Sequence, residues 1–231
     1  MVRTENAEIR NPKSLPSRQA GEIRNLKEII KIENEGVQTY YLTKYLLEKY
    51  PKKKWVIDAG ALQMMELSWI PHDAILTPHQ GEFERLLSKI TNYKLQITNK
   101  SQISNLEIFK QDISMEEKVK LFARTFNCTV LLKGERDIVC TGKCEGNVCL
   151  PTECGIVEGG NAGMTKGGTG DVLAGMVAAL YTKNEAFLAA AGAAFVHKRA
   201  GEDLYTKNGY WYNASDLTDQ IPQTMKRLFF L

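Results

Sequence analysis

The sequence predicts an α/β fold in which helices cover both faces of a mostly parallel sheet. Short apolar runs, several of them stopped by an acidic residue or a proline, alternate with segments of helical periodicity. A glycine-rich segment then leads directly into a helical region that fills the last third of the chain. With 231 residues, 43% of them apolar, the chain can bury one sizeable core and does not require a second domain.

The first half of this pattern follows a charged N-terminal region. Residues 1–35 combine high charge with little periodicity and are expected to form a polar, partly flexible arm. The folded domain is therefore expected at 36–231. Its first predicted elements are a helix at 39–50 that Pro51 ends, a strand at 55–58, a strand at 74–77 that Pro78 ends, and a helix at 81–89.

The second half continues the alternation and then becomes helical. It predicts a helix at 116–126, a strand at 128–132, an antiparallel hairpin of 137–141 with 147–150, and helices at 169–181, 185–203 and 215–228. Pro222 is expected to kink or divide the last helix. The polar segment 91–114 between the two halves is interpreted as an insertion or a lid.

Composition excludes several classes of protein. The chain has 30 basic and 27 acidic residues, a net charge of +3, which argues against a dedicated nucleic-acid-binding protein. No apolar run approaches the roughly 18 residues of a membrane span. Residues 1–19 are polar and lack the apolar core of a secretory signal. A cytoplasmic protein without a membrane partner is therefore expected.

Four of the five cysteines fall in one short stretch: Cys140, Cys144, Cys149 and Cys154. A zinc site is one interpretation, but the spacing lacks the paired C-x2-C knuckles that identify such sites. The favoured interpretation is a set of reduced thiols on a pair of strands, because disulfides are rare in a reducing compartment.

The segment with the clearest chemistry is the glycine loop at 167–171, which opens a predicted helix. Gly167, Gly168 and Gly170 let the backbone approach a ligand closely, because no Cβ stands in the way. The N–H groups of the loop and of the first helical turn would converge on one point, which favours a bound phosphate. Asp171 would lie at that point and could accept the proton of a hydroxyl group that attacks phosphorus.

A simpler alternative exists for this loop. It could be a glycine-rich turn in which Asp171 is only a favourable charge at a helix N-terminus. The loop is not a P-loop, since no Gly-Lys-Ser/Thr follows it, and it is not a G-x-G-x-x-G fingerprint after a first strand. Taken alone, it indicates phosphoryl chemistry on an unidentified alcohol.

Residues 167–175, Gly-Gly-Thr-Gly-Asp-Val-Leu-Ala-Gly, resemble the signature of the ribokinase-like superfamily, in the form found in ADP/ATP-dependent NAD(P)H-hydrate dehydratases. Three further segments resemble that family in the same order: V-I-D-A-G-A-L at 56–62, L-T-P-H-Q-G-E-F at 76–83 and L-K-G-E-R-D at 132–137. One such match could arise by chance, but four in order are specific. The resemblance runs from residue 37 to the C-terminus.

The resemblance implies a ribokinase-like fold and the repair of NADH or NADPH whose nicotinamide ring has been hydrated. In such enzymes a nucleotide, ADP or ATP, phosphorylates the hydroxyl group of the hydrate, and departure of the phosphate restores the ring. Mg²⁺ is the implied metal, because it bridges nucleotide phosphates in phosphoryl transfer. Hydrated NADH or NADPH is the implied partner.

The resemblance also assigns roles to single residues. Asp171 is the implied catalytic base and contacts the substrate, and His79 and Asp58 are the implied further substrate contacts. Glu82 would orient Mg²⁺ through a water molecule. The implied nucleotide-binding residues are Lys133, Gly134, Glu135, Arg136 and Asp137 in one segment and Gly167, Gly168, Thr169 and Gly170 in the other.

Several of these residues have simpler interpretations. Glu82 could equally be a solvated acid at a helix start, and His79 an exposed residue that caps a turn. Lys133 could be a surface lysine at a strand end. His197, inside an alanine-rich helix, is expected to be a packing residue only.

The sequence departs from the family pattern near its N-terminus. The family carries an earlier α/β portion that ends in a G-P-G-L-G segment, and only Gly36-Val37 could be a remnant of it. A member with a shortened N-terminal part is therefore expected. Its exposed sheet edge would favour pairing with another chain, and hence a homo-oligomer. A small-molecule kinase of the same superfamily and a catalytically impaired nucleotide-binding remnant stay open as alternative functions.

Overall fold

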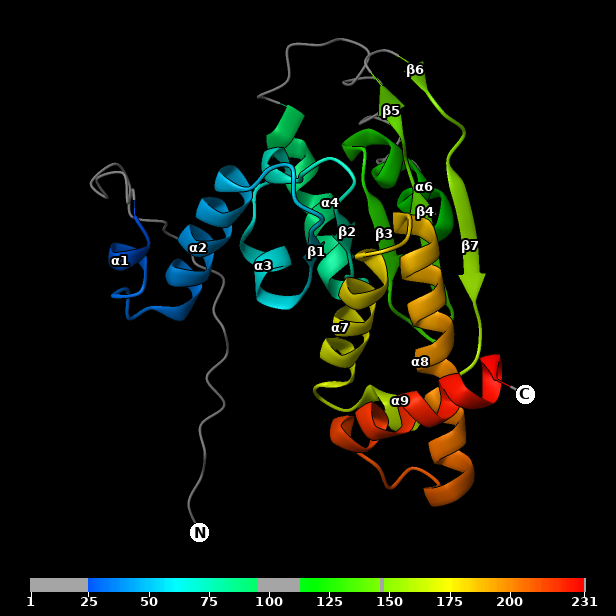
Figure 1. The fold of residues 1–231 in the computed structure, drawn as a ribbon. Helices are drawn as coiled ribbons and strands as arrows, with labels where there is room; N and C mark the ends of the chain where they lie inside the picture. The colour runs from blue at the N-terminus through cyan, green and yellow to red at the C-terminus, as the bar shows by residue number, and fades with distance from the viewer. Residues whose placement is uncertain (1–24, 95–112, 146–147, 231) are drawn as a thin grey trace.

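The computed structural model describes residues 25–94, 113–145 and 148–230 (Figure 1). Its helices are α1 Leu26–Ile29, α2 Glu35–Lys49, α3 Ala59–Met64, α4 Gln80–Lys94, α6 Met115–Phe126, α7 Thr169–Tyr181, α8 Ala186–Asn208 and α9 Ala214–Phe229. Its strands are β1 Val56–Ile57, β2 Ile75–Leu76, β3 Thr129–Leu132, β4 Asp137–Thr141, β5 Cys144–Glu145, β6 Val148–Cys149 and β7 Glu153–Val157.

The main sheet has five strands in the order β1-β2-β3-β4-β7. The pairs β1/β2 and β2/β3 are parallel, and the pairs β3/β4 and β4/β7 are antiparallel. The predicted α/β class is confirmed, but the sheet is mixed rather than mostly parallel. The reason is that β3 and β4 are joined by a tight turn, which permits only antiparallel pairing.

Helices cover both faces of this sheet (Figure 1). Alternate strand residues point to opposite faces. Ile57 and Leu76 pack with α2, α3, α4 and α6 in one apolar core, whereas Val56 and Ile75 pack with α7 and α8 in a second. Alanines make up much of the α8 side of the second core, which lets this helix approach the sheet and α7 closely.

The ends of the helices follow local sequence signals. Helix α6 begins with a capping box, in which Ser114 and Glu117 satisfy each other's backbone N–H groups. It ends at Asn127, whose left-handed backbone (φ 48°) closes the last turn. Helix α9 begins with a second capping box, formed by Asn213 and Asp216. These caps place the helix boundaries within a few residues of those predicted.

Two predicted features of the chain are wrong. Strand β4 does not form a hairpin with 147–150. Its antiparallel partner is β7, and β5 pairs with β6 in a separate two-stranded sheet. Pro222 does not divide the last helix, because α9 is continuous from Ala214 to Phe229 and this proline lies on its exposed side. Most of the predicted arm, residues 1–24, and residues 95–112 of the predicted insertion lie outside the described residues.

The oxidation state of the cysteines also differs from the prediction. Cys140 and Cys154 form a disulfide bond that joins β4 to β7, and Cys144 is disulfide-bonded as well. Cys128 is the buried free thiol, and burial raises its pKa. The expected set of reduced thiols was therefore wrong, because antiparallel pairing places Cys140 directly opposite Cys154. Within the part of the chain that the structure describes, no group of three or more His, Cys, Asp or Glu could hold a metal ion.

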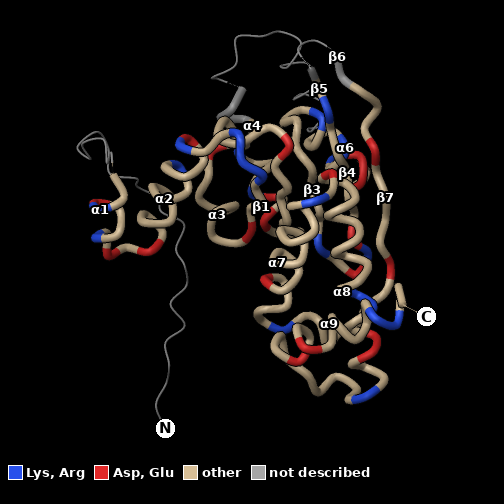
Figure 2. Tube along the Cα trace, viewed as in Figure 1, with Lys and Arg blue, Asp and Glu red and all other residues tan. Residues whose placement is uncertain are grey.

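Charge is distributed unevenly over the helices. Helix α7 carries Asp171 as its single charged residue, and the first half of α8 carries none (Figure 2). Even so, none of the described helices combines the length and the apolar character needed to cross a membrane. The uncharged stretches are instead the parts of α7 and α8 that pack in the second core.

Gly142 follows β4 at a point where the chain passes close to α6. A Cβ at this position would lie 2.4 Å from the backbone of Ala123 and Arg124. We expect Gly142→Ala to lower the free energy of unfolding by about 2 kcal/mol, because a backbone cannot yield as a flexible side chain can. Urea unfolding measures this change.

The matched control is Gly175→Ala on an exposed part of α7, where a Cβ would meet nothing within 4 Å. It should raise stability by roughly 0.5–1 kcal/mol, because alanine favours a helix over glycine. Equal stability of Gly142→Ala and the unmodified protein would contradict the close approach of the chain to α6.

Candidate active site

A cavity of ≈ 1060 Å³ lies where β1, β2 and β3 end and α7 begins. Its volume is at the upper end of the range for small-molecule sites. It is lined by every residue for which the sequence predicted a role: Asp58, His79, Glu82, Lys133, Gly134, Glu135, Arg136, Asp137, Gly167, Gly168, Thr169, Gly170 and Asp171. The fold thus brings four separate sequence motifs to one place.

The glycine loop is held in shape by its own residues. Gly168 caps α7 with φ 90° and ψ −18°, a left-handed conformation that favours glycine. The Thr169 hydroxyl donates to the carbonyl oxygens of Met164 (2.7 Å) and Lys166 (2.9 Å), which ties the loop to the preceding turn. A Cβ at Gly167 would meet nothing within 4 Å. The loop therefore presents open backbone to the cavity at a helix N-terminus, as an anion site requires.

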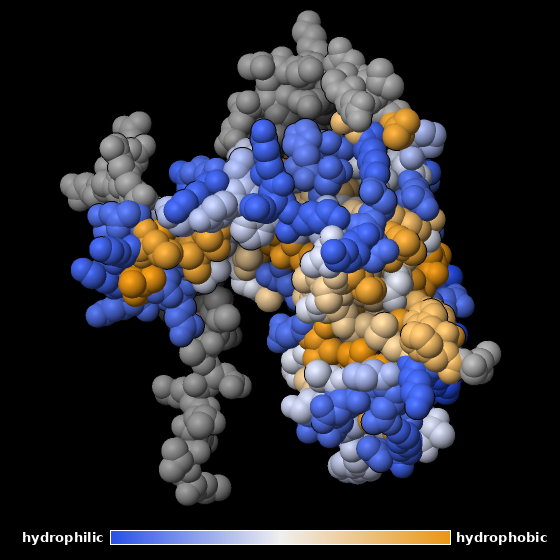
Figure 3. Space-filling view, viewed as in Figure 1, coloured by the Kyte–Doolittle hydropathy of each residue, from blue (hydrophilic) through white to orange (hydrophobic). Residues whose placement is uncertain are grey.

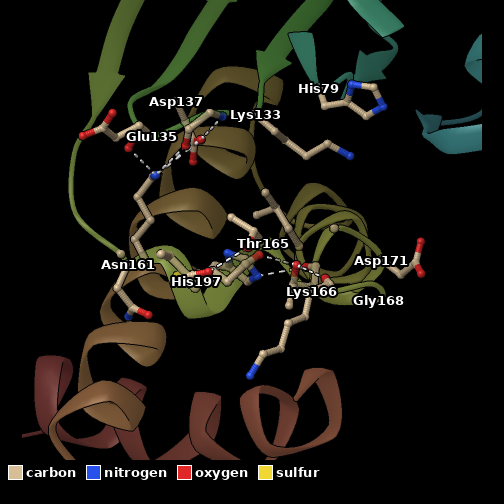
Figure 4. A pocket seen from close by; sticks show the side chains of 18 of the residues that line it. His79, Lys133, Glu135, Asp137, Asn161, Thr165, Lys166, Gly168, Asp171 and His197 are labelled. Atoms are coloured by element: carbon tan, nitrogen blue, oxygen red, sulfur yellow. Dashed lines mark hydrogen bonds and ion pairs between the residues drawn. The ribbon is translucent and has the colours of Figure 1, made fainter. Parts of the chain in front are cut away.

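Lys133 and Asp58 form an ion pair beside this loop. The Lys133 ammonium lies 2.7 Å from Asp58 Oδ1, and both side chains are largely buried. The same ammonium would stand 3.3 Å from a Cβ built on Gly170. Figure 4 shows Lys133 extending from the end of β3 across the cavity. Its charge therefore lies at the N-terminus of α7, where a phosphate would bind.

His79 and Glu82 form a tight local unit at the start of α4. The Glu82 carboxylate accepts the His79 N–H (3.0 Å) and the Gln63 side-chain amide (3.4 Å), and its Oε1 lies 3.5 Å from His79 Nε2. In return the Glu82 N–H donates to His79 Nδ1 (3.3 Å). Glu82 is only 4% exposed, so the solvated acid considered from the sequence is wrong. His79 is exposed, and its ring is available to a ligand.

Asp137 is buried at the opposite wall of the cavity. Its Oδ1 accepts the Gly134 N–H (2.9 Å) and lies 3.4 Å from the Lys198 ammonium. Burial raises the pKa of the Asp137 carboxyl, against the opposing effects of Gly134 and Lys198. These contacts fix a turn over 134–137 rather than leave a charged group facing the ligand.

Asp171 lies in the first turn of α7 and is exposed. Figure 4 shows its carboxylate at the margin of the cavity, on the side away from Asp137 and Glu135. Because its carboxylate makes no hydrogen bond or ion pair with the residues that the structure describes, its oxygens are available to a substrate hydroxyl. This position agrees with the role of a base at the cavity mouth.

The sequence assigned no role to twelve further residues that line the cavity, most of which come from α8 and from the segment before the glycine loop. They are Ala59, Glu158, Gly159, Gly160, Asn161, Ala162, Met164, Thr165, Lys166, Leu173, His197 and Lys198. His197 was expected to be a packing residue, and it is indeed buried, but its Nε2 also lies 3.0 Å from the Thr169 carbonyl oxygen. The one available signal was the Asn161-Ala162-Gly163 segment directly before the loop.

The donors present fit Mg²⁺ only if the nucleotide supplies most of its ligands. The described residues hold no cluster of three or more candidate ligands, and Mg²⁺ usually takes one or two carboxylates, phosphate oxygens and water. Glu82, Glu135 and Asp171 are the cavity-lining carboxylates that form no ion pair with a lysine or arginine among the described residues. The fit is therefore to a nucleotide-bound Mg²⁺ rather than to a cation held by protein alone.

Fold and site together define an α/β protein with a ribokinase-like fold, in which a glycine loop at a helix N-terminus lines the cavity. A family model described as NAD(P)H-hydrate dehydratase matches residues 32–223. The chain belongs to this NAD(P)H-hydrate dehydratase family.

Individual proteins of known name with similar sequences support the same family assignment. The bifunctional NAD(P)H-hydrate repair enzyme Nnr of Methanocaldococcus jannaschii is 32% identical over 210 residues, which cover 89% of this chain and 35% of that protein. The ADP-dependent (S)-NAD(P)H-hydrate dehydratase of Nitrosopumilus maritimus is 34% identical over 188 residues, which cover 80% of this chain and 56% of that protein. The chain thus spans between a third and just over half of the length of these relatives.

A solved structure shows the same fold. The ADP/ATP-dependent NAD(P)H-hydrate dehydratase of Bacillus subtilis, co-crystallised with ATP/Mg²⁺ and soaked with CoA, has a TM-score of 0.54 to this chain at 26% identity. The match covers 75% of this chain and 56% of the B. subtilis chain.

Proposed function

We propose that this chain dehydrates hydrated NADH and NADPH with the use of ADP or ATP and Mg²⁺, and so restores the normal cofactors. The observation that carries the proposal is the convergence of four family motifs on one cavity, where a phosphate loop, a free carboxylate and an exposed histidine meet. Membership of the family supports the same reaction.

In the proposed reaction, Asp171 accepts the proton of the hydrate's hydroxyl group as its oxygen attacks the terminal phosphorus of the nucleotide. The N–H groups of Gly168 and Gly170 stabilise the charge on the transferring group, whereas the Thr169 N–H donates to the Lys166 carbonyl oxygen (3.3 Å) and so helps to hold the loop. Lys133 adds a positive charge at the same point. Loss of phosphate from one ring carbon and of a proton from its neighbour then restores the double bond. Mg²⁺, when bound, neutralises charge on the nucleotide phosphates.

The remaining site residues receive proposed roles from their positions. His79 contacts the substrate, and Asp58 does so beside its ion pair with Lys133. Glu135, Arg136, Gly134 and Asp137 form the wall for the base and ribose of the nucleotide.

The deciding experiment incubates the purified protein with hydrated NADH, Mg²⁺ and either ADP or ATP, and follows the recovery of NADH absorbance. Recovery that requires a nucleotide is expected. If neither nucleotide gives recovery while both bind, the dehydratase proposal fails and an impaired nucleotide-binding remnant is favoured instead.

Gly168→Ala tests the loop. The left-handed backbone at this position (φ 90°) is unfavourable for alanine, and the new Cβ would lie 3.0 Å from that of Ala214. We expect the nucleotide KM to rise about tenfold, equivalent to about 1.4 kcal/mol. Initial rates measured against nucleotide concentration give this value, with Gly175→Ala as the control. A nucleotide KM unchanged by Gly168→Ala would remove the loop from nucleotide binding.

Glu82 is proposed to orient Mg²⁺ through a water molecule, since a carboxylate offers about four lone-pair positions and its neighbours use three. Glu82→Gln keeps an oxygen that can accept the His79 N–H but removes the charge. The Mg²⁺ concentration for half-maximal rate should rise severalfold, because water bound to Mg²⁺ interacts more strongly with a carboxylate. A Mg²⁺ dependence identical to that of the unmodified protein would exclude the role.

We also propose that the chain works in the cytoplasm and self-associates. Its disulfides are compatible with that compartment mainly in hyperthermophiles, so thiol trapping in fractionated source cells is the relevant test.

Phe229 and Phe230, at the end of α9, are 58% and 78% exposed, and apolar atoms reach the surface there (Figure 3). Light scattering with and without substitution of both phenylalanines by serine tests self-association through this end.

A further inference from the structure

Lys198 is a buried cation that the proposed reaction does not use. It lies in the middle of α8, and its side chain is only 6% exposed. Its ammonium lies within 3.1 Å of the Gly134 carbonyl oxygen, 2.9 Å of that of Glu135 and 3.3 Å of that of Gly159. With Asp137 Oδ1 at 3.4 Å, four oxygen atoms surround a single positive charge.

These oxygen atoms come from two separate turns. Gly134 and Glu135 belong to the turn between β3 and β4, and Asp137 is the first residue of β4, whereas Gly159 follows β7. The two turns are neighbours because β4 and β7 pair with Asp137 opposite Val157. Both turns line the cavity. Lys198 therefore joins two parts of one cavity wall to the helix behind them.

The contacts also orient backbone donors. In a trans peptide, the C=O of one residue and the N–H of the next point in opposite directions. With the carbonyl groups of Gly134 and Glu135 turned toward Lys198, the N–H groups of Glu135 and Arg136 point away from it. Neither N–H has a backbone partner in the described ranges, so both are free to meet acceptor atoms of a ligand.

The second turn is fixed in a comparable way. Gly159 and Gly160 have φ values of 111° and 78°, and the Gly160 N–H donates to Glu202 Oε1 (3.1 Å). Glu202 also pairs with Arg199 (2.6 Å). Two adjacent helical turns of α8 thus supply the groups that hold this wall, and Lys198 is the residue that contacts both 134–137 and Gly159.

We propose that Lys198 is a positioning residue for nucleotide binding, which holds the turns at 134–137 and 159–160 in the arrangement that receives the nucleotide. The inference rests on the proposed use of a nucleotide by this cavity. It assigns no contact between Lys198 and the reacting atoms. Its loss should therefore weaken nucleotide binding while the hydrate and Asp171 keep their places.

The test compares Lys198→Met with Lys207→Met, a control on the exposed end of the same helix. Isothermal calorimetry with Mg·ADP and with Mg·ATP gives the Kd, and initial rates give kcat and the two KM values. For Lys198→Met we expect the nucleotide Kd and KM to rise at least tenfold, with the hydrate KM within twofold. Lys207→Met should match the unmodified protein in all of these.

A second variant guards against loss of folding. Lys198→Met leaves the Asp137 carboxylate buried without its cation, which is strongly destabilising. The second variant therefore combines Lys198→Met with Asp137→Asn, so that both buried charges are removed together. A folded variant of either kind that binds nucleotide within twofold of the unmodified protein overturns the inference. So does failure of both variants to fold, which would assign Lys198 to folding alone.

The outcomes separate this inference from the proposed function. If the unmodified protein binds nucleotide but does not restore NADH, the dehydratase proposal fails, and the calorimetric comparison still tests Lys198. If the unmodified protein restores NADH and Lys198→Met binds nucleotide normally, only the role of Lys198 is lost. If the unmodified protein binds no nucleotide at all, both are overturned.

Discussion

Asp171→Asn is expected to lower kcat about 10³-fold and to leave the nucleotide KM within twofold. Asparagine has nearly the same shape as aspartate but cannot accept a proton, and general bases contribute roughly 10²–10⁴-fold to a rate. Asp171 is exposed at the first turn of α7, so its substitution disturbs little packing. Steady-state rates of NADH recovery measure the loss.

The control for this prediction is Asp219→Asn, an exposed acid on α9 that does not line the cavity. It should leave kcat unchanged. If Asp171→Asn turns over at the normal rate, the base is another group. If kcat is normal and only the nucleotide KM rises, Asp171 belongs to nucleotide binding instead.

Acid should destabilise the protein through His197. Burial lowers the pKa of this imidazole from 6.5 to about 4, with smaller contributions from Lys198 and Lys133. Between pH 6.5 and 4 the unfolded chain binds a proton at this position and the folded chain does not, so stability falls as the pH falls. The loss should reach about 3 kcal/mol near pH 4, at 1.36 kcal/mol per unit of pKa shift, and should be absent above pH 6.5.

Urea unfolding over this pH range, for the unmodified protein and for His197→Gln, measures the effect. Glutamine can still donate a hydrogen bond toward the Thr169 carbonyl oxygen but does not titrate. The stability difference between the two proteins should therefore shrink as the pH falls. The raised pKa of Asp137 has the opposite influence on stability, but it is common to both proteins and cancels. A difference that stays constant from pH 7 to 4 would show that His197 is not buried in its neutral form.

The features that the sequence predicted well depend on local signals. The glycine loop, the cap of α7 and the end of β1 at Asp58 are each set by a few neighbouring residues. The cavity at this edge follows from a general rule, because the carboxyl ends of parallel strands and the N-termini of the following helices meet on one side of a sheet.

The features that were missed depend on contacts between distant residues. Nothing near 137–141 in the chain indicates that its partner is 153–157, and the cysteine spacing gives no pairing without that register. Lys198 interrupts an alanine-rich helix and would normally be assigned to solvent. Its partners lie 63 and 39 residues away in the chain, in turns whose position only the folded sheet defines.

The Cys140–Cys154 bond has a topological consequence. It closes a covalent ring with a sequence separation of 14, and β5 and β6 lie within that ring. The disulfide thus fixes β4 against β7 at the base of the small β5/β6 hairpin. The register of β4 against β7 therefore does not depend on the length of this hairpin. A longer or shorter hairpin would therefore leave β4 and β7 paired as they are, and with them the cavity-lining turns at 134–137 and 159–160.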